Sequence, residues 1–212
     1  MAGIGPVVAP EVVTPSGSSA YSDFIDLRTA VIENVGRPDI ADVFPRLLSL
    51  AEARFAREVR ARDQIKTVTL TLAGNQVLLP EDWLETIGVV DAMGREYIQQ
   101  SPQFVKGSDS GAYYSIEGGY LVGPLDSGDV EMVYYSAIPS LGEGVTATNW
   151  LLQRYPDLYE SAVTFEAAKH VKDAEMAEVY RRLARESLRD LRADDSRARY
   201  SRVRVRLSGP TP

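Results

Sequence analysis

The sequence has 212 residues, of which 44% are hydrophobic and 25% charged, a composition typical of a soluble globular protein with one domain and an addition, or with two small domains. It contains no cysteine and a single histidine, which excludes disulfides, cysteine-based zinc sites and most histidine-rich metal sites. The net charge of −7 disfavours loose adsorption to nucleic acid. No apolar run approaches the roughly 20 residues needed to span a bilayer, and the start lacks a signal-peptide pattern, so we expect a cytosolic protein.

Residues 1–20, MAGIGPVVAPEVVTPSGSSA, contain three prolines and three glycines and show no hydrophobic periodicity. This composition predicts an extended N-terminal arm, because such a segment cannot bury enough apolar surface to offset the entropy that it loses on ordering. An arm of this kind gains order from a neighbouring molecule, which indicates assembly into a larger complex.

Two helices are expected after this arm. The first begins near Ser22 or Asp23, either of which can cap it. The second has an apolar stripe at the 3.6-residue period, and Asp42 as its cap would place Pro45 in the first turn, so we expect the main helix to begin near Val43. Its polar face is interpreted as solvated surface or as half of an inter-subunit contact: Glu52, Arg54, Arg57, Glu58 and Arg60.

The pattern changes to a period of two from Ile65, where Val68, Leu70 and Leu72 alternate with threonines. This alternation predicts a strand, and the turn AGN followed by QVLLP completes a hairpin. Further strands are expected in WLETIGVVDA, GREYIQQS and DVEMVYYSAIP, and a second hairpin with a two-glycine turn in AYYSIEGGYLVGP. About six short strands are thus predicted, which form a β region inserted between two helical blocks.

Helix resumes in NWLLQRYPDLYESAVTFEAAKHV, residues 149–171, with Thr146 or Thr148 as its cap. The proline in this segment forces a kink and starts a fresh helix. The aromatic residues around the proline are expected to lock the angle at which the chain re-enters the helical part. We call this set the fold junction: Trp150, Tyr155, Pro156 and Tyr159.

A last helix is expected from about Ala174 to Asp194, so that four long helices result, two on each side of the β region. Neither pair can cover its own apolar stripe, so the two pairs should pack together. The expected fold is therefore α+β: a four-helix bundle formed by residues 21–62 and 145–196, interrupted by an inserted antiparallel β region at residues 63–144, with extended arms at residues 1–20 and 197–212.

The C-terminal region is rich in arginine and has no acidic residue from Arg197 onward. Three interpretations remain open: it binds DNA phosphates, it adds as a strand to the sheet edge of another protein and pairs its arginines with carboxylates, or it is a solvated terminus. Strict alternation with apolar residues in SRVRVRL favours the second. The candidate docking residues are Arg197, Arg199, Arg202, Val203, Arg204, Val205, Arg206 and Leu207.

Catalytic chemistry has few candidate residues. Glu166 and His170 lie four positions apart on one helix face and could form half of a metal site or an oriented base. No second histidine or cysteine completes either arrangement, and no nucleophile or phosphate-loop motif is present, so a plain polar histidine is the favoured interpretation. The tyrosines of the β region are interpreted as core and interface residues rather than as base-stacking groups. We expect a protein that is not an enzyme and uses no metal or cofactor.

Five segments together resemble the phage adaptor proteins, the head-to-tail adaptor (connector) proteins of tailed phages: LLSLAEARFAREVRA, LLPEDWLE, YSIEGGYL, VEMVYYSAIPSL and NWLLQRYPDLYESAVTFEAA. They span roughly residues 47–195, most of the chain. The resemblance implies a helical bundle interrupted by a β excursion and assembly as a twelve-fold ring beneath the portal protein. It also implies that the C-terminal arm docks to the portal, a role that SRVRVRLSGPTP matches in position and composition.

The partners implied by the resemblance are further copies of the chain, the portal protein and a tail or tail-nozzle protein, while DNA passes through the ring without specific binding. Such a protein is assembled in the host cytoplasm and resides in the neck of the virion. Two rival hypotheses remain: a DNA-binding accessory protein that uses the arginine-rich C-terminus, and an enzyme on cell-wall or nucleic-acid polymers centred on Glu166 and His170.

Overall fold

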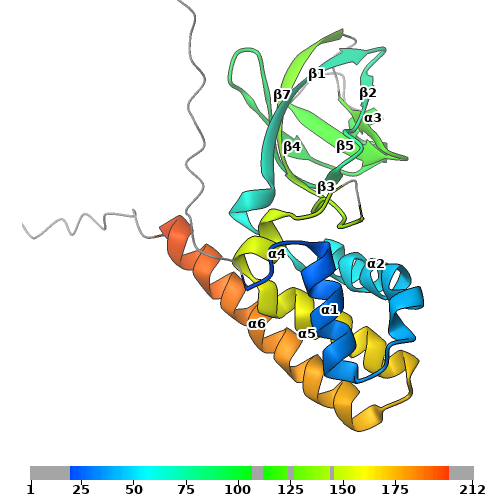
Figure 1. The fold of residues 1–212 in the computed structure, drawn as a ribbon. Helices are drawn as coiled ribbons and strands as arrows, with labels where there is room; N and C mark the ends of the chain where they lie inside the picture. Colours follow the sequence, from blue (N-terminus) through cyan, green and yellow to red (C-terminus); the bar gives the residue numbers. More distant parts are fainter. Residues whose placement is uncertain (1–19, 107–111, 124–126, 144–145, 201–212) are drawn as a thin grey trace, which may run out of the picture.

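The computed structural model describes residues 20–106, 112–123, 127–143 and 146–200. Within these ranges the chain forms a helical part and a β-barrel, which lie end to end (Figure 1). The chain enters the helical part, passes once through the barrel and returns to the helical part. None of the helices in the described ranges is long and apolar enough to cross a membrane.

The helical part contains α1 (Phe24–Val35), α2 (Ile40–Glu58), α4 (Trp150–Arg154), α5 (Pro156–His170) and α6 (Ala174–Tyr200). Helix α5 is central, because it packs against α1, α2 and α6. These helices share one apolar core, in which Phe24 packs edge to face on Phe44 with ring centroids 5.3 Å apart. Segments from both ends of the chain therefore complete a single core.

The starts of α1 and α2 differ in how well they could be predicted. Asp23 caps α1, since its Oδ1 accepts hydrogen bonds from two backbone N–H groups of the first turn. Helix α2 begins at Ile40, not near Val43, so Pro45 lies inside the helix rather than in its first turn. Ile40 is fully buried and extends the apolar stripe by one turn, which offsets the hydrogen bond lost at the proline.

The barrel contains β1 (Ile65–Ala73), β2 (Gln76–Leu78), β3 (Trp83–Asp91), β4 (Glu96–Gln99), β5 (Tyr113–Glu117), β6 (Tyr120–Val122) and β7 (Ser127–Ser136), with a short helix α3 (Pro102–Lys106) and a 3₁₀ turn η1 (Arg62–Gln64). The strands close in the order β1-β2-β6-β5-β4-β3-β7. Strand β7 is the centre of the longest pairings, because it lies antiparallel to both β1 and β3.

The predicted four-helix bundle with an inserted antiparallel β region is wrong. The described residues contain six α-helices and a closed seven-stranded barrel, in which β4 and β5 pair in parallel. The barrel has its own apolar core, so it is a separate body rather than an excursion that leans on the helices. Local periodicity identifies strands, but closure depends on pairings between distant segments.

The predicted extended arms are corrected in part. Helix α6 continues to Tyr200, so Arg197 and Arg199 belong to a helix and not to an extended C-terminal arm. Ion pairs within the last turns support this extension, since Arg197 pairs with Asp194 and Arg199 pairs with Asp195. The predicted arms at residues 1–19 and 201–212 lie outside the described residues.

Candidate functional site

A buried polar network connects the barrel to the helical part at Tyr159. This residue is fully buried in α5, and its ring packs edge to face on Phe55 of α2 with centroids 4.9 Å apart. Its hydroxyl donates to Oε1 of Glu52 (3.2 Å) and accepts from Nδ2 of Asn149 (2.9 Å). Burial, and then the adjacent Glu52 carboxylate, raise the pKa of Tyr159, so the hydroxyl remains a donor.

Asn149 links three segments in this network. Its Oδ1 accepts a hydrogen bond from the N–H of Leu152 (2.9 Å) and so caps α4, the position for which Thr146 or Thr148 was predicted. Its Nδ2 also donates to the carbonyl of Pro139 (2.7 Å), in the segment that leaves the barrel. A buried asparagine with these partners fixes the path of the chain between β7 and α4.

Glu52 anchors the same segment from the side of α2. Its Oε1 accepts a hydrogen bond from the N–H of Leu141 (2.8 Å) in addition to the one from Tyr159. Burial raises the pKa of the Glu52 carboxyl above its ordinary value of 4.5, although the hydrogen bonds to Leu141, Ser140 and Tyr159 oppose this effect. The polar face of α2 is therefore not exposed to solvent along its whole length, because the Glu52 carboxylate is bonded to Tyr159 of the fold junction and to Leu141.

The raised pKa of Glu52 predicts the direction of a pH effect. The folded state holds this proton more tightly than the unfolded state, so the free energy of unfolding should fall as pH rises above 4.5 and through the raised pKa. Replacement of Glu52 by Gln should remove this part of the pH dependence, while the side-chain oxygen can still accept from Leu141. Urea unfolding at a series of pH values measures the effect.

The matched control for this experiment is Glu143→Gln, which removes a carboxylate that is 73% exposed in the neighbouring loop. The control should retain the pH profile of the unmodified chain. Parallel profiles for the unmodified chain and Glu52→Gln would contradict the assignment of Glu52 as a partly buried carboxyl that stabilises the chain at the fold junction.

The four residues of the fold junction lie together around the break between α4 and α5. Tyr155 ends α4 with φ −134° and ψ 60°, and Pro156 occupies the first position of α5, where its missing N–H is no loss. The carbonyl of Tyr155 accepts from the N–H groups of Leu158 and Tyr159, which closes the first turn of α5. Trp150 and Tyr155 are partly buried and pack against the helical core.

The described candidate docking residues, Arg197 and Arg199, lie in the last turns of α6. These turns adjoin the base of the barrel, the end of the barrel that faces the helical part. The Nε of Arg199 donates to Oδ2 of Asp195 (2.6 Å), and its guanidinium lies 5.7 Å from the centroid of the Tyr135 ring. Asp195 also accepts from the N–H of Arg62 (2.7 Å), directly before β1. The other candidates lie outside the described residues: Arg202, Val203, Arg204, Val205, Arg206 and Leu207.

Glu166 and His170 do not form a common site. The Glu166 carboxylate is 4% exposed and accepts hydrogen bonds from Arg54 (2.6 Å) and Lys169 (2.7 Å). His170 is exposed, and its Nδ1 lies 3.2 Å from a guanidinium nitrogen of Arg46. In the part of the chain that the structure describes, no group of three or more histidine, aspartate or glutamate side chains could hold a metal ion.

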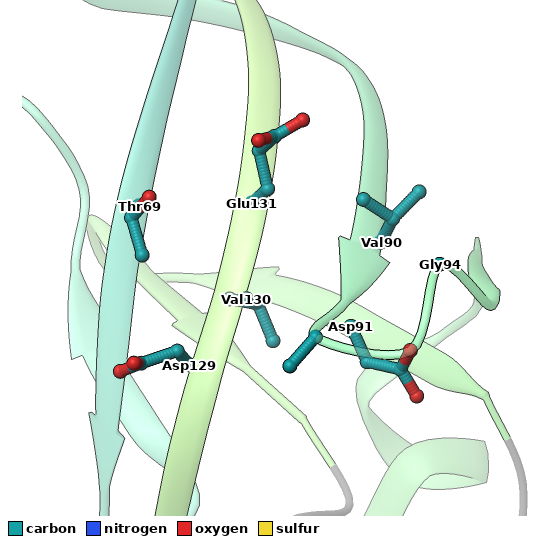
Figure 2. A pocket seen from close by; sticks show the side chains of 8 residues that line it. Thr69, Val90, Asp91, Gly94, Asp129, Val130 and Glu131 are labelled. Carbon is teal, nitrogen blue, oxygen red and sulfur yellow. The ribbon is translucent and has the colours of Figure 1, made fainter.

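A cleft of about 380 Å³ crosses the outside of β1, β7 and β3 (Figure 2). Three carboxylates line it. Asp91 accepts hydrogen bonds from the N–H of Arg95, the Arg95 guanidinium and the N–H of Met93, which lower its pKa and fix the turn between β3 and β4. Asp129 accepts from the hydroxyl of Thr71 (2.7 Å), and Glu131 lies opposite Thr69. Two of the three carboxylates are therefore bonded within the barrel: Asp91 to the turn after β3, and Asp129 to Thr71 of β1.

Negative charge is concentrated in the barrel. Residues 65–136 contain ten acidic and three basic residues, a net charge of −7, which equals the net charge of the whole chain. Residues 201–212 carry three arginines and no acidic residue. The two regions therefore have opposite charge, and the base of the barrel lies where α6 ends.

No curated protein matches the chain. A family model described as SU10 adaptor protein matches residues 22–206. The matched range includes all the helices and strands described above, and it extends past the end of α6 into the arginine-rich C-terminus. The predicted relationship to phage adaptor proteins is thereby confirmed, and the chain belongs to the SU10 adaptor protein family of phage head-to-tail adaptors.

Proposed function

We propose that the chain is a structural head-to-tail adaptor that forms a ring beneath the portal protein and continues its DNA channel toward the tail. The family match over residues 22–206 is the observation that carries this proposal. Because the chain is a phage adaptor, it is a component of the virion, and its proposed place is the neck. We propose twelve copies in the ring, assembly in the host cytoplasm, and a tail or tail-nozzle protein as the partner on the other side.

The proposed portal-docking residues are those of the arginine-rich C-terminus. Support comes from the alternation of Arg and apolar residues in SRVRVRL, which follows α6, and from the end of α6, which lies where the helical part meets the barrel (Figure 1). An alternating segment can pair its backbone with a sheet edge of the portal and its guanidinium groups with carboxylates.

The proposed channel role agrees with the charge of the barrel. A region with ten acidic and three basic residues in its sequence has a net negative charge that repels the phosphates of DNA, which suits a conduit that must not hold DNA. The proposed role is therefore structural rather than enzymatic. Buried Glu166 is paired with Arg54 and Lys169 and so supports the helical fold, while His170 lies next to Arg46.

The alternative is a DNA-binding accessory protein that uses the three C-terminal arginines. It predicts that the chain retains duplex DNA at moderate salt and that removal of residues 201–212 abolishes this binding. The adaptor proposal predicts no retention at the same salt concentration. A DNA mobility-shift series with increasing salt distinguishes the two.

Association with the portal protein tests the proposed function directly. The purified chain is mixed with portal rings of the same phage, and the mixture is separated by size-exclusion chromatography with light scattering. The proposal predicts a complex whose mass exceeds that of the portal by a ring of adaptors. Separate elution of portal and adaptor across a range of salt concentrations and protein ratios would contradict it.

A further inference from the structure

One edge of β1 is unpaired along most of its length. On one side β1 pairs with β7 from Ile65 opposite Tyr135 to Ala73 opposite Ser127. On the other side, the pairing within the described residues is limited to Ala73 with Gln76, at the turn into β2. The backbone N–H and C=O groups of residues 65–71 that face this side are therefore available to a further strand.

The side chains of β1 fit an added strand with one apolar and one polar face. Leu72 is 1% exposed, next to the pairing with β2, whereas Val68 and Leu70 remain only partly buried beside the unpaired edge. On the opposite face the threonines of β1 are exposed and lie next to carboxylates of β7, with Thr69 opposite Glu131 (Figure 2). An added strand would find an apolar surface inside and carboxylates outside.

Helix α6, which directly precedes the C-terminal segment in the sequence, ends beside the start of β1 and the end of β7. Asp195 of α6 accepts the N–H of Arg62, three residues before β1, and Arg199 lies over Tyr135, the residue paired with Ile65. Residues 202–207 then alternate Arg with Val or Leu, so that one face of a strand would be cationic and the other apolar. Length also agrees, because six residues span about 20 Å when extended.

We propose that residues 202–207 of the same chain add as a strand to the unpaired edge of β1. The segment runs parallel to β1, away from the base of the barrel. Its valines cover Val68 and Leu70, and its arginines reach across the threonines to Asp129 and Glu131. The strand closes the exposed edge of the free protein and neutralises part of the acidic barrel surface.

Strand β3 also has a stretch that lacks a second partner among the described residues, because β4 pairs only with Val89 and Val90. Its pairing with β7 is interrupted by register shifts between Trp83 and Glu85 and between Thr86 and Gly88. The regular edge of β1 is the better template for a strand that alternates without interruption. The β3 edge therefore provides a control position.

Disulfide trapping in the purified full-length chain tests the proposal. The natural sequence has no cysteine, so two introduced cysteines are the only thiols. Thr69→Cys is combined in turn with cysteine at each position from 202 to 207, and mild oxidation is followed by non-reducing electrophoresis. The proposal predicts that cross-linked monomer forms with cysteine at 202, 204 or 206 and is lost with cysteine at 203, 205 and 207, because only the arginine positions share the face of Thr69.

The matched control places the first cysteine at Ile87, an exposed residue of β3. Cross-linking that is equal at Ile87, that follows the valine positions, that joins two chains into a covalent dimer, or that is absent at all six positions would overturn the proposal. Circular dichroism confirms that each variant is folded.

Amide hydrogen exchange gives a second readout without any substitution in the barrel. A chain that ends at Tyr200 should show faster exchange than the full chain at the N–H groups of β1 that face the unpaired edge. Equal exchange in the two chains would overturn the proposal. Both experiments use the isolated chain, so their outcome is independent of whether the same segment docks to a portal.

Discussion

A chain that ends at Tyr200 is expected to lose portal docking while it keeps its fold. The truncation removes residues 201–212 but leaves α6 intact, including the ion pair between Arg199 and Asp195 and the hydrogen bond from Arg62 to Asp195. The proposed docking arm would lose three arginines and three alternating apolar residues, and with them both the backbone pairing and the charge-assisted contacts to the portal. Co-elution with portal rings should fall to the background level.

The matched control is a chain that ends at Leu207, which removes only the last five residues and keeps the alternating segment. This chain should dock as the full chain does. Both truncated chains should unfold cooperatively on heating when followed by circular dichroism, which confirms that each keeps its fold. Undiminished docking by the chain that ends at Tyr200 would remove the C-terminal arm from the proposed function.

Replacement of Tyr159 by Ala is expected to lower the free energy of unfolding by about 3–5 kcal/mol, because it empties a fully buried aromatic site. The change removes the edge-to-face contact with Phe55 as well as the hydroxyl shared by Glu52 and Asn149. Chemical denaturation of the purified chain measures the loss. The helical core should be affected first, since Tyr159 lies in that core and not in the barrel.

Two further variants separate packing from hydrogen bonding. Tyr159→Phe keeps the ring and should cost about 1 kcal/mol, since Glu52 retains its bond from Leu141 and Asn149 retains its bond to Pro139. Tyr120→Ala, at a tyrosine that is 40% exposed in the barrel, should cost less than Tyr159→Ala. Equal losses for Tyr159→Ala and Tyr120→Ala would show that the junction does not stabilise the fold.

Local chemistry made several elements predictable. The cap of α1 could be narrowed to Ser22 or Asp23, of which the structure has Asp23, and the β1 to β2 hairpin could be predicted because its turn contains Gly74 and Asn75, both with positive φ. The second hairpin turns at Gly118 and Gly119, also with positive φ. In each case a few neighbouring residues determine the backbone conformation.

Long-range pairings could not be predicted in this way. Closure of the barrel requires β2 to pair with β6 and β4 to pair in parallel with β5, and each of these contacts involves three or fewer residue pairs. Such short strands give almost no periodic signal. The last residues of α6, up to Tyr200, lack an apolar stripe and are supported by side-chain ion pairs. Hydrophobic periodicity therefore predicted the end of this helix too early, near Asp194.

The sequence indicates the four residues of the fold junction, but not the polar partners Glu52 and Asn149 that bond to Tyr159. Trp150, Tyr155 and Tyr159 cluster around a proline in the sequence, but Glu52 lies 107 residues before Tyr159, among other charged residues of α2. Nothing in its immediate sequence distinguishes it from a solvated carboxylate. The capping role of Asn149 could have been predicted, because an asparagine directly before a helix is a strong capping signal.

An image of the neck of the virion at a resolution that traces helices tests the central claim most directly. The account predicts a ring of this chain between the portal and the tail, with the barrel beside an open axial channel and the C-terminal segment in contact with the portal. A neck ring built from another protein, or copies of this chain located elsewhere in the particle, would contradict it.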